Sequence, residues 1–266
     1  MTTDGKPVTI PDFAAWKGQG RKISVLTAYE FSIARLLDEA GVDCLLVGDS
    51  MGTAVQGHET TLSVTLDQVV YHAEMVARAA KRALVVADLP FLSYHVSRRQ
   101  AIRSAGRFFK ETRCQAVKLE GGTRVAPTIR ALVDAEMPVM GHIGLTPQSV
   151  RRFGGFKVQR DSDALRADAQ AVAEAGAFAL VLECIPAELA ATITAEVSIP
   201  TIGIGAGAGC DGQVLVLHDM LGLIDDFRPR FARRYVEGGE LIRSAAARFV
   251  KDVESGEFPN ESESFR

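Results

Sequence analysis

The chain has 266 residues, a formal net charge of −3 and 47% hydrophobic residues. So small a net charge gives no basis for binding nucleic acid or an anionic membrane surface. The four cysteines lack metal-type CxxC spacing and indicate reduced core thiols, and the sequence opens without the apolar core of a signal peptide. We therefore expect a cytoplasmic protein with neither nucleic acid nor membrane as a partner.

Eight short apolar segments predict the strands of a parallel sheet, because they are rich in β-branched residues and bounded by Gly or Pro. In chain order they begin near Ile23, Cys44, Ala83, Ala116, Val139, Phe178, Thr201 and Val214. Helical patterns fill most of the gaps, over residues 31–40, 66–80, 98–113, 125–136, 164–175 and 188–196. The clearest pattern, over 66–80, repeats apolar residues at i, i+3 and i+4, and Thr65 or Asp67 can cap it. A last helix is expected over about 234–253.

Strands alternating with helices predict an α/β fold, specifically a (β/α)8 TIM barrel, whose typical length of roughly 250 residues fits one large domain. We expect this catalytic domain to span 1–254, with a short helix over 8–16 capping the bottom of the barrel. The polar, acidic residues 255–266 are expected to be disordered. Only 206–212 separate the last two strands, fewer than a parallel crossover usually needs. Either the seventh helix is reduced to a turn, or the strand boundaries differ there.

Four of the predicted strands lead directly into a carboxylate: Asp49, Asp88, Glu120 and Glu183. Strand carboxyl ends share one mouth of a barrel, where ligands bind. All-oxygen ligation by one to three carboxylates, completed by water or substrate, suits Mg²⁺, whereas the clusters that favour zinc are absent from the sequence. Structural ion pairs explain any single acid about as well, but four acids together favour a site.

Two further side chains belong to the same strand ends. Lys118 shares a strand face with Glu120, since side chains alternate along a strand. It can bind a substrate carboxylate, form a Schiff base or serve as a counter-ion for Glu120; the surrounding acids favour carboxylate binding. His142 ends the fifth strand, where a hydrogen-bonded packing role is more frequent than catalysis. Gly141 and Gly144 leave room beside it for a ligand, so an auxiliary catalytic role stays open.

Two glycine-rich segments have less specific meanings. Residues 203–212 contain a formal GxGxxG, but the match lies late in the chain and does not open a helix after the first strand. A tight turn, or close approach of the backbone to a ligand, explains this segment better. Residues 153–159 pair glycines with aromatic residues and are either a mobile lid or an ordinary surface loop.

Seven segments together closely resemble the ketopantoate hydroxymethyltransferase family. They are VGDS at 47–50, QGH at 56–58, ADLPF at 87–91, VKLEGG at 117–122, GHIGLTPQ at 141–148, LECIP at 182–186 and IGIGAG at 202–207. The resemblance covers nearly the whole chain in order. One departure follows Gln159, where the family pattern usually continues with glycine and this chain has Arg160-Asp161. That departure bears on the expected lid and not on the chemistry.

The resemblance implies a metal-dependent barrel enzyme of pantothenate synthesis. Such an enzyme transfers a hydroxymethyl group from 5,10-methylenetetrahydrofolate, its co-substrate, to 3-methyl-2-oxobutanoate and gives 2-dehydropantoate. The 2-oxo acid would chelate Mg²⁺ through a carboxylate oxygen and its keto oxygen, and the ion would stabilise the enolate that forms when C3 loses its proton. The similar enzymes are homodecamers built from pentameric rings.

The resemblance also assigns roles to residues. It implies that Asp49, Asp88 and Glu120 bind Mg²⁺ and that Glu183 is the catalytic base. It implies that the 2-oxo acid is held by Asp49, Ser50, Asp88 and Lys118. His142 is an additional candidate for assisting the folate or protonating the product.

Two alternatives to this enzyme stay open. The first is a lyase of the isocitrate lyase or phosphoenolpyruvate mutase type, which also uses Mg²⁺ on a similar barrel. Isocitrate lyases typically carry a Cys-Gly-His loop signature that this sequence lacks. The second is a non-catalytic, metal-dependent metabolite-binding protein, which would need the metal ligands and Lys118 but not Glu183.

Overall fold

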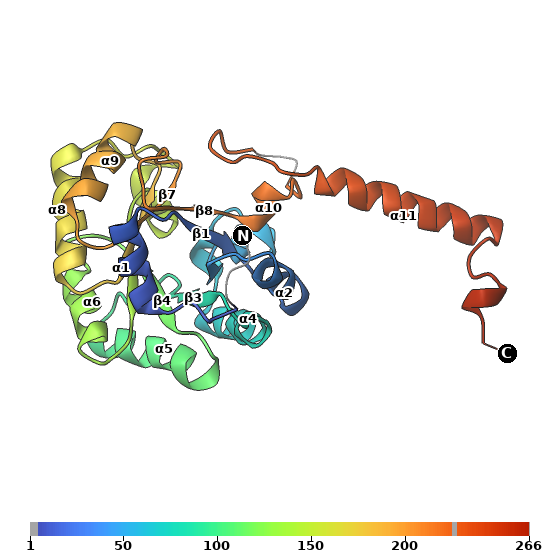
Figure 1. The fold of residues 1–266 in the computed structure, drawn as a ribbon, viewed down its shortest axis with the longest axis horizontal. Helices are drawn as coiled ribbons and strands as arrows, with labels where there is room; N and C mark the ends of the chain where they lie inside the picture. Colours follow the sequence, from blue (N-terminus) through green and yellow to red (C-terminus); the bar gives the residue numbers. More distant parts are fainter. Residues whose placement is uncertain (1–4, 225–227, 266) are drawn as a thin grey trace. The chain divides into compact units, whose positions relative to one another are not determined.

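The computed structural model describes residues 5–224 and 228–265. Within this part of the chain, eight parallel strands close into a barrel in which each strand pairs with the next and β8 pairs with β1 (Figure 1). The strands are β1 (Ile23–Thr27), β2 (Cys44–Val47), β3 (Leu84–Asp88), β4 (Ala116–Glu120), β5 (Val139–Gly144), β6 (Ala179–Glu183), β7 (Thr201–Ile204) and β8 (Gly212–Leu215). The predicted (β/α)8 fold is confirmed, with every strand beginning within two residues of its expected start.

Helices follow most strands and surround the barrel (Figure 1). They are α2 (Phe31–Glu39), α3 (Met51–Ala54), α4 (Leu66–Ala79), α5 (Arg98–Glu111), α6 (Ala126–Val133), α7 (Val150–Phe153), α8 (Ser162–Glu174) and α9 (Ala187–Glu196). Short 3-10 turns cover η1 (Thr61–Ser63) and η2 (Pro147–Ser149). The start of α4 illustrates how sequence sets these boundaries. Thr65 and Gln68 form a capping box in which each side chain accepts a hydrogen bond from the other's backbone N–H.

The link between β7 and β8 contains turns and no helix within the described residues 205–211. Both strands have only four residues, about 13 Å each, and seven residues can span up to about 23 Å. The short link can therefore return to the start of β8 without a helix. Asp211 fixes this connection, because its carboxylate accepts a hydrogen bond from the Thr201 backbone and pairs with Lys17 at 2.8 Å. Of the two sequence alternatives, the reduced seventh helix is the correct one.

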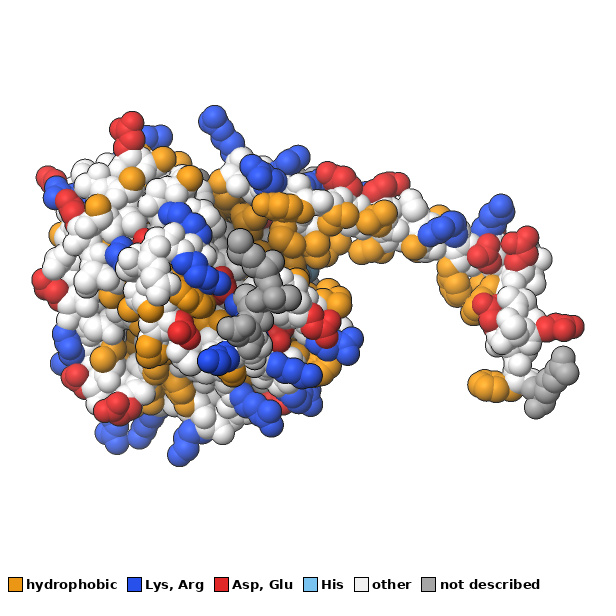
Figure 2. Space-filling view, viewed as in Figure 1, with side chains coloured by type: hydrophobic (Ala, Val, Ile, Leu, Met, Phe, Trp, Pro, Cys, Tyr) orange, Lys and Arg blue, Asp and Glu red, His pale blue; other side chains and the backbone are white. Residues whose placement is uncertain are grey.

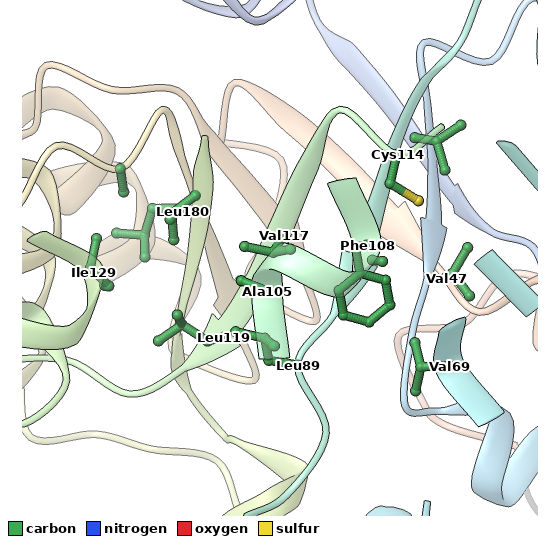
Figure 3. Close-up of a cluster of buried hydrophobic side chains, with 14 of the residues drawn as sticks. Val47, Val69, Leu89, Ala105, Phe108, Cys114, Val117, Leu119, Ile129 and Leu180 are labelled. Atoms are coloured by element: carbon green, nitrogen blue, oxygen red, sulfur yellow. The ribbon is translucent and has the colours of Figure 1, made fainter. Parts of the chain in front are cut away.

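One apolar layer lies outside the barrel sheet, and a second fills its interior. In the outer layer, Val117 and Leu119 of β4 pack beside Phe108 and Ala105 of α5 (Figure 3). Because side chains alternate along a strand, this packing turns Lys118 and Glu120 of the same strand toward the barrel interior. The fold thereby decides which residues of β4 reach the site.

The inner layer fills the barrel and is completed by α1 (Ile10–Gln19). Phe13 of α1 is fully buried among inward-facing strand residues, and its ring lies 5.4 Å from the ring of Phe178. The expected capping helix over 8–16 is confirmed. Since α1 and these apolar side chains fill the interior, polar chemistry is restricted to the opposite end, where the strands finish.

The chain divides into two compact units, residues 1–216 and 217–266. The second contains α10 (Leu217–Met220), α11 (Gly238–Ser255) and the short turn η3 (Glu261–Glu263). The expected catalytic domain reached residue 254, so its extent, like the disorder expected for 255–266, stays a prediction. Among the residues described, no helix combines the length and apolarity required to cross a bilayer.

Candidate active site

The predicted site residues lie at the carboxyl ends of neighbouring strands. Pairing of β3 with β4 places Asp88 opposite Lys118, and pairing of β4 with β5 places Glu120 opposite His142. Glu183 is the last residue of β6 and lies opposite Gly144 of β5. Register alone therefore brings side chains from four strands to one end of the barrel, as the sequence predicted.

Lys118 is at the centre of this cluster. Its Nζ lies 2.8 Å from Asp88 Oδ1 and 3.2 Å from His142 Nδ1. On the far side of the imidazole ring, His142 Nε2 lies 3.1 Å from Glu183 Oε2. The contacts form one continuous series from Asp88 to Glu183.

Asp49 and Ser50 enter the site from the loop after β2. The backbone N–H of Asp49 donates a 2.9 Å hydrogen bond to Asp88 Oδ2, which draws the two acids together. Ser50 Oγ lies 2.8 Å from the hydroxyl of Tyr29, so its orientation is fixed by a buried aromatic residue. All seven residues predicted from the sequence thus lie in one connected region.

Gln148 and Tyr94 also belong to the site and were not assigned a role from the sequence. Gln148 Nε2 donates to Asp49 Oδ2 at 2.9 Å, and its backbone N–H donates to Glu120 Oε2 at 3.0 Å. The Tyr94 hydroxyl donates to Gln148 Oε1 at 2.8 Å. Gln148 therefore holds two candidate metal ligands in place, Asp49 through its side chain and Glu120 through its backbone. The sequence signals for Gln148 were its position soon after the fifth strand and its place at the end of the family segment 141–148, and neither assigned it a role.

The cluster concentrates negative charge where little water can reach it. Asp49, Asp88, Lys118, Glu120 and His142 are all nearly inaccessible. Burial and the neighbouring Asp88 charge raise the pKa of Asp49 to about 7, and burial followed by the Asp49 charge raises the pKa of Glu120 well above its usual value. Burial alone would lower the pKa of Lys118, but the surrounding carboxylates outweigh it and raise that pKa. The Lys118 ammonium stays charged, and the three acidic side chains outnumber this single cation.

Glu183 and His142 differ from Asp49, Asp88 and Glu120. The side chain of Glu183 keeps 15% of its surface exposed, so it faces the opening. Burial raises the pKa of this carboxyl to about 7, although the Lys118 charge opposes the shift. Burial and the charge of Lys118 lower the pKa of His142 well below its usual value, so the imidazole is neutral at pH 7. A carboxylate that gains and loses a proton near neutrality is suited to general base catalysis.

The donor set fits a magnesium ion that substrate helps to bind. Glu120 Oε1 is buried and makes no hydrogen bond to the described protein, and Asp88 Oδ1 contacts the Lys118 ammonium at 2.8 Å. In the same part of the chain, no three Asp, Glu, His or Cys side chains are arranged to hold a metal by themselves. Mg²⁺ usually takes one or two carboxylates and completes its octahedron with substrate and water oxygens. Asp49 and Asp88, with Glu120 beside them, meet that requirement.

The segment around 153–159 follows α7 and leads into α8. The Arg160-Asp161 departure has a structural effect here, because the Asp161 side chain caps α8 by accepting a hydrogen bond from the Ala164 backbone. The backbone N–H of Gln159 donates to the carbonyl of Cys184, next to Glu183. Cys184 adopts φ = 49°, a strained backbone conformation for a residue other than glycine. The segment thus contacts the strand end that carries Glu183; lid motion stays a prediction.

Replacing Gln148 with Leu tests whether this amide organises the site. The change removes the donor to the buried Asp49 Oδ2 and one of the partners of the Tyr94 hydroxyl, so we expect the free energy of unfolding to fall by about 1–3 kcal/mol. Urea denaturation measures the change. Gln170→Leu on the exposed face of α8 is the matched control and should shift stability by less than about 0.5 kcal/mol. Equal stability of Gln148→Leu and the parent would contradict an organising role.

Comparison with known proteins gives relatives along the whole chain. A family model described as ketopantoate hydroxymethyltransferase matches residues 7–261. The chain is 55% identical to a 3-methyl-2-oxobutanoate hydroxymethyltransferase of Geobacter sulfurreducens, covering 97% of this chain and 98% of that protein. It is 53% identical to the protein of the same name from Pelobacter propionicus, with both chains fully covered.

Solved structures share the fold at much lower identity. A phosphoenolpyruvate phosphomutase from Streptomyces platensis subsp. rosaceus matches with a TM-score of 0.63 at 17% identity, covering 93% of this chain and 88% of that one. A phosphonopyruvate hydrolase in complex with oxalate and Mg²⁺ matches with a TM-score of 0.60 at 12% identity, covering 96% and 92%. These likenesses support the barrel alone, whereas the full-length matches above 50% identity decide the family. The chain belongs to the ketopantoate hydroxymethyltransferase family.

Proposed function

We propose that this chain transfers a hydroxymethyl group from 5,10-methylenetetrahydrofolate to 3-methyl-2-oxobutanoate and gives 2-dehydropantoate. Family membership and the names of relatives above 50% identity support this reaction. The observation that carries the proposal is the position of Glu183. Its carboxyl, with a pKa of about 7, faces the opening and connects through neutral His142 to the Lys118–Asp88 pair.

Binding of the 2-oxo acid would use the charges already present. Lys118 offers an ammonium to the substrate carboxylate, and Ser50 a hydroxyl held by Tyr29. Asp49, Asp88 and Glu120 would hold Mg²⁺, which acts as a Lewis acid that stabilises negative charge on the keto oxygen. The buried carboxylates and Gln148 keep this end of the site in fixed geometry before substrate arrives.

Glu183 would then take the proton from C3 of the substrate. The electron pair left on C3 forms the new bond to the methylene carbon of the co-substrate, and the two bonds from that carbon to folate nitrogens break. Water supplies the hydroxyl oxygen, and the proton from C3 and one from water end on the two nitrogens. His142, 3.1 Å from Glu183, would hold the carboxylate toward C3.

Glu183→Gln separates catalysis from mere binding. An amide cannot take up the C3 proton, so exchange of that proton in deuterated water should slow by about a hundredfold or more. Proton NMR of 3-methyl-2-oxobutanoate with Mg²⁺ and without folate measures the exchange, and calorimetry checks that the substrate still binds. Glu188→Gln, at the exposed start of α9, should exchange like the parent. Full exchange by Glu183→Gln would remove Glu183 as the base.

Magnesium should stabilise the protein in a pH-dependent manner. A carboxylate must be deprotonated to bind the ion, and the pKa of Asp49 is about 7. Saturating Mg²⁺ should raise the Tm by about 5 °C at pH 8 and by clearly less at pH 6. Scanning calorimetry with Mg²⁺ or with EDTA measures this shift. Asp88→Asn should remove it, and an equal shift in that variant would place the ion elsewhere.

We further propose that copies of the chain associate, as the homodecamer implied by the resemblance requires. Apolar side chains lie exposed along α11 (Figure 2), among them Leu241, Ile242 and Phe249. Exposed apolar surface of this kind marks an interaction site more often than a solvated one. Sedimentation velocity should show one large species, and Ile242→Glu should shift it to smaller ones. A monomeric parent chain would contradict the proposal.

A further inference from the structure

A cavity lies beside the candidate active site and takes no part in the mechanism proposed above. Its volume is about 360 Å³, at the lower end of the range for small-molecule sites. The walls come from the loop after β4, the end of β5, α7 with the segment that follows it, and the first turns of α8. All of these elements belong to the barrel unit.

The cavity wall continues to the residues around Glu183. Gly144, which lines the cavity, lies opposite Glu183 in the sheet, and the next residue donates its backbone N–H to the Glu183 carbonyl at 2.8 Å. A Cβ on Gly144 would lie 2.2 Å from that carbonyl, so only glycine permits this approach. Gln159, on another wall, donates its backbone N–H to the neighbouring Cys184 carbonyl. A ligand in the cavity would therefore end close to the proposed base.

Of the charged groups around the cavity, the two acids have hydrogen-bond partners, whereas the two arginines have no ion-pair partner among the described residues. Asp161 caps α8, and Asp168 accepts hydrogen bonds from the backbone N–H and the hydroxyl of Thr123. Arg124 and Arg152 form no ion pair with any described residue, although both line the cavity and are exposed. Two guanidinium groups thus remain available to an anion, and guanidinium groups bind carboxylates in a planar, two-point geometry.

The remaining walls suit an aromatic or apolar body. Phe153, Ile143 and Leu165 also line the cavity, and the Arg152 guanidinium lies over the Phe153 ring, 5.3 Å from its centroid. The ligand that fits has a flat apolar part, one or more carboxylates at one end and a reactive group at the other. Inorganic anions would satisfy the arginines but leave the apolar walls without a partner.

We propose that this cavity binds the aminobenzoyl part and the carboxylate tail of the reduced-folate co-substrate, with Arg124 and Arg152 paired to the tail. The cavity is too small for the whole co-substrate and would hold only the aminobenzoyl part and the tail. The end that carries the one-carbon group would extend out of the cavity toward Glu183. The proposal rests on the proposed function, because it is the folate donor that requires such a site.

The test compares ligands that differ only in the tail. Calorimetry would measure the Kd of 5-formyltetrahydrofolate, which has the glutamate tail, and of 5-formyltetrahydropteroate, which lacks it, with Mg²⁺ and 3-methyl-2-oxobutanoate present. Arg124→Gln and Arg152→Gln should each weaken the first probe by about tenfold and leave the second unchanged. Arg151→Gln, the neighbouring exposed arginine outside the cavity lining, is the matched control.

Each outcome decides the proposal. It is overturned if the parent chain does not bind the tailed probe, if both probes weaken equally, or if Arg151→Gln has the same effect as Arg152→Gln. Turnover by the parent chain with unchanged folate affinity in both variants would reject the cavity and leave the proposed function intact. Tail-dependent binding without any product from 3-methyl-2-oxobutanoate would support the cavity and reject the proposed function.

Discussion

The arrangement of this barrel depends on one electrostatic constraint, the crowding of carboxylates around a single buried ammonium. Lys118 pairs with Asp88, while Asp49 and Glu120 complete an acidic group that little water reaches. Isolated buried charges are costly, and one lysine cannot balance three acids. Burial accordingly raises the pKa of Asp49 to about 7. A divalent cation would offset this excess, as the proposed function requires.

The rest of the fold holds that cluster in place. Outward packing of Val117 and Leu119 against α5 turns Lys118 and Glu120 inward, and α1 closes the other end with Phe13. Above the strands, Gln148 joins Asp49 to Glu120 through its side chain and its backbone. Hydrogen bonds therefore hold the acidic end of the site in place. The site opens toward Glu183, which keeps part of its side chain exposed and adjoins the arginine-lined cavity.

The folds shared with phosphoenolpyruvate phosphomutase and phosphonopyruvate hydrolase show how little the barrel alone says about reaction type. At 12–17% identity they share strand order and overall path with this chain. Chemistry on such a scaffold is set by side chains at the strand ends and by the loops that follow. Here the strand ends carry Glu183 on β6, which contacts His142, and a neighbouring cavity is built from the loops after β4 and β5.

The sequence by itself determined the eight strands, most helices and the acids at the barrel mouth, because apolar periodicity and position at a strand end are local signals. The resemblance supplied the family and the expected roles. Only the tertiary structure decided that the β7–β8 link needs no helix, that Gln148 and Tyr94 brace the acids, and that Arg124 and Arg152 share a cavity. These features depend on contacts between residues far apart in the chain, and such contacts form only when the barrel closes.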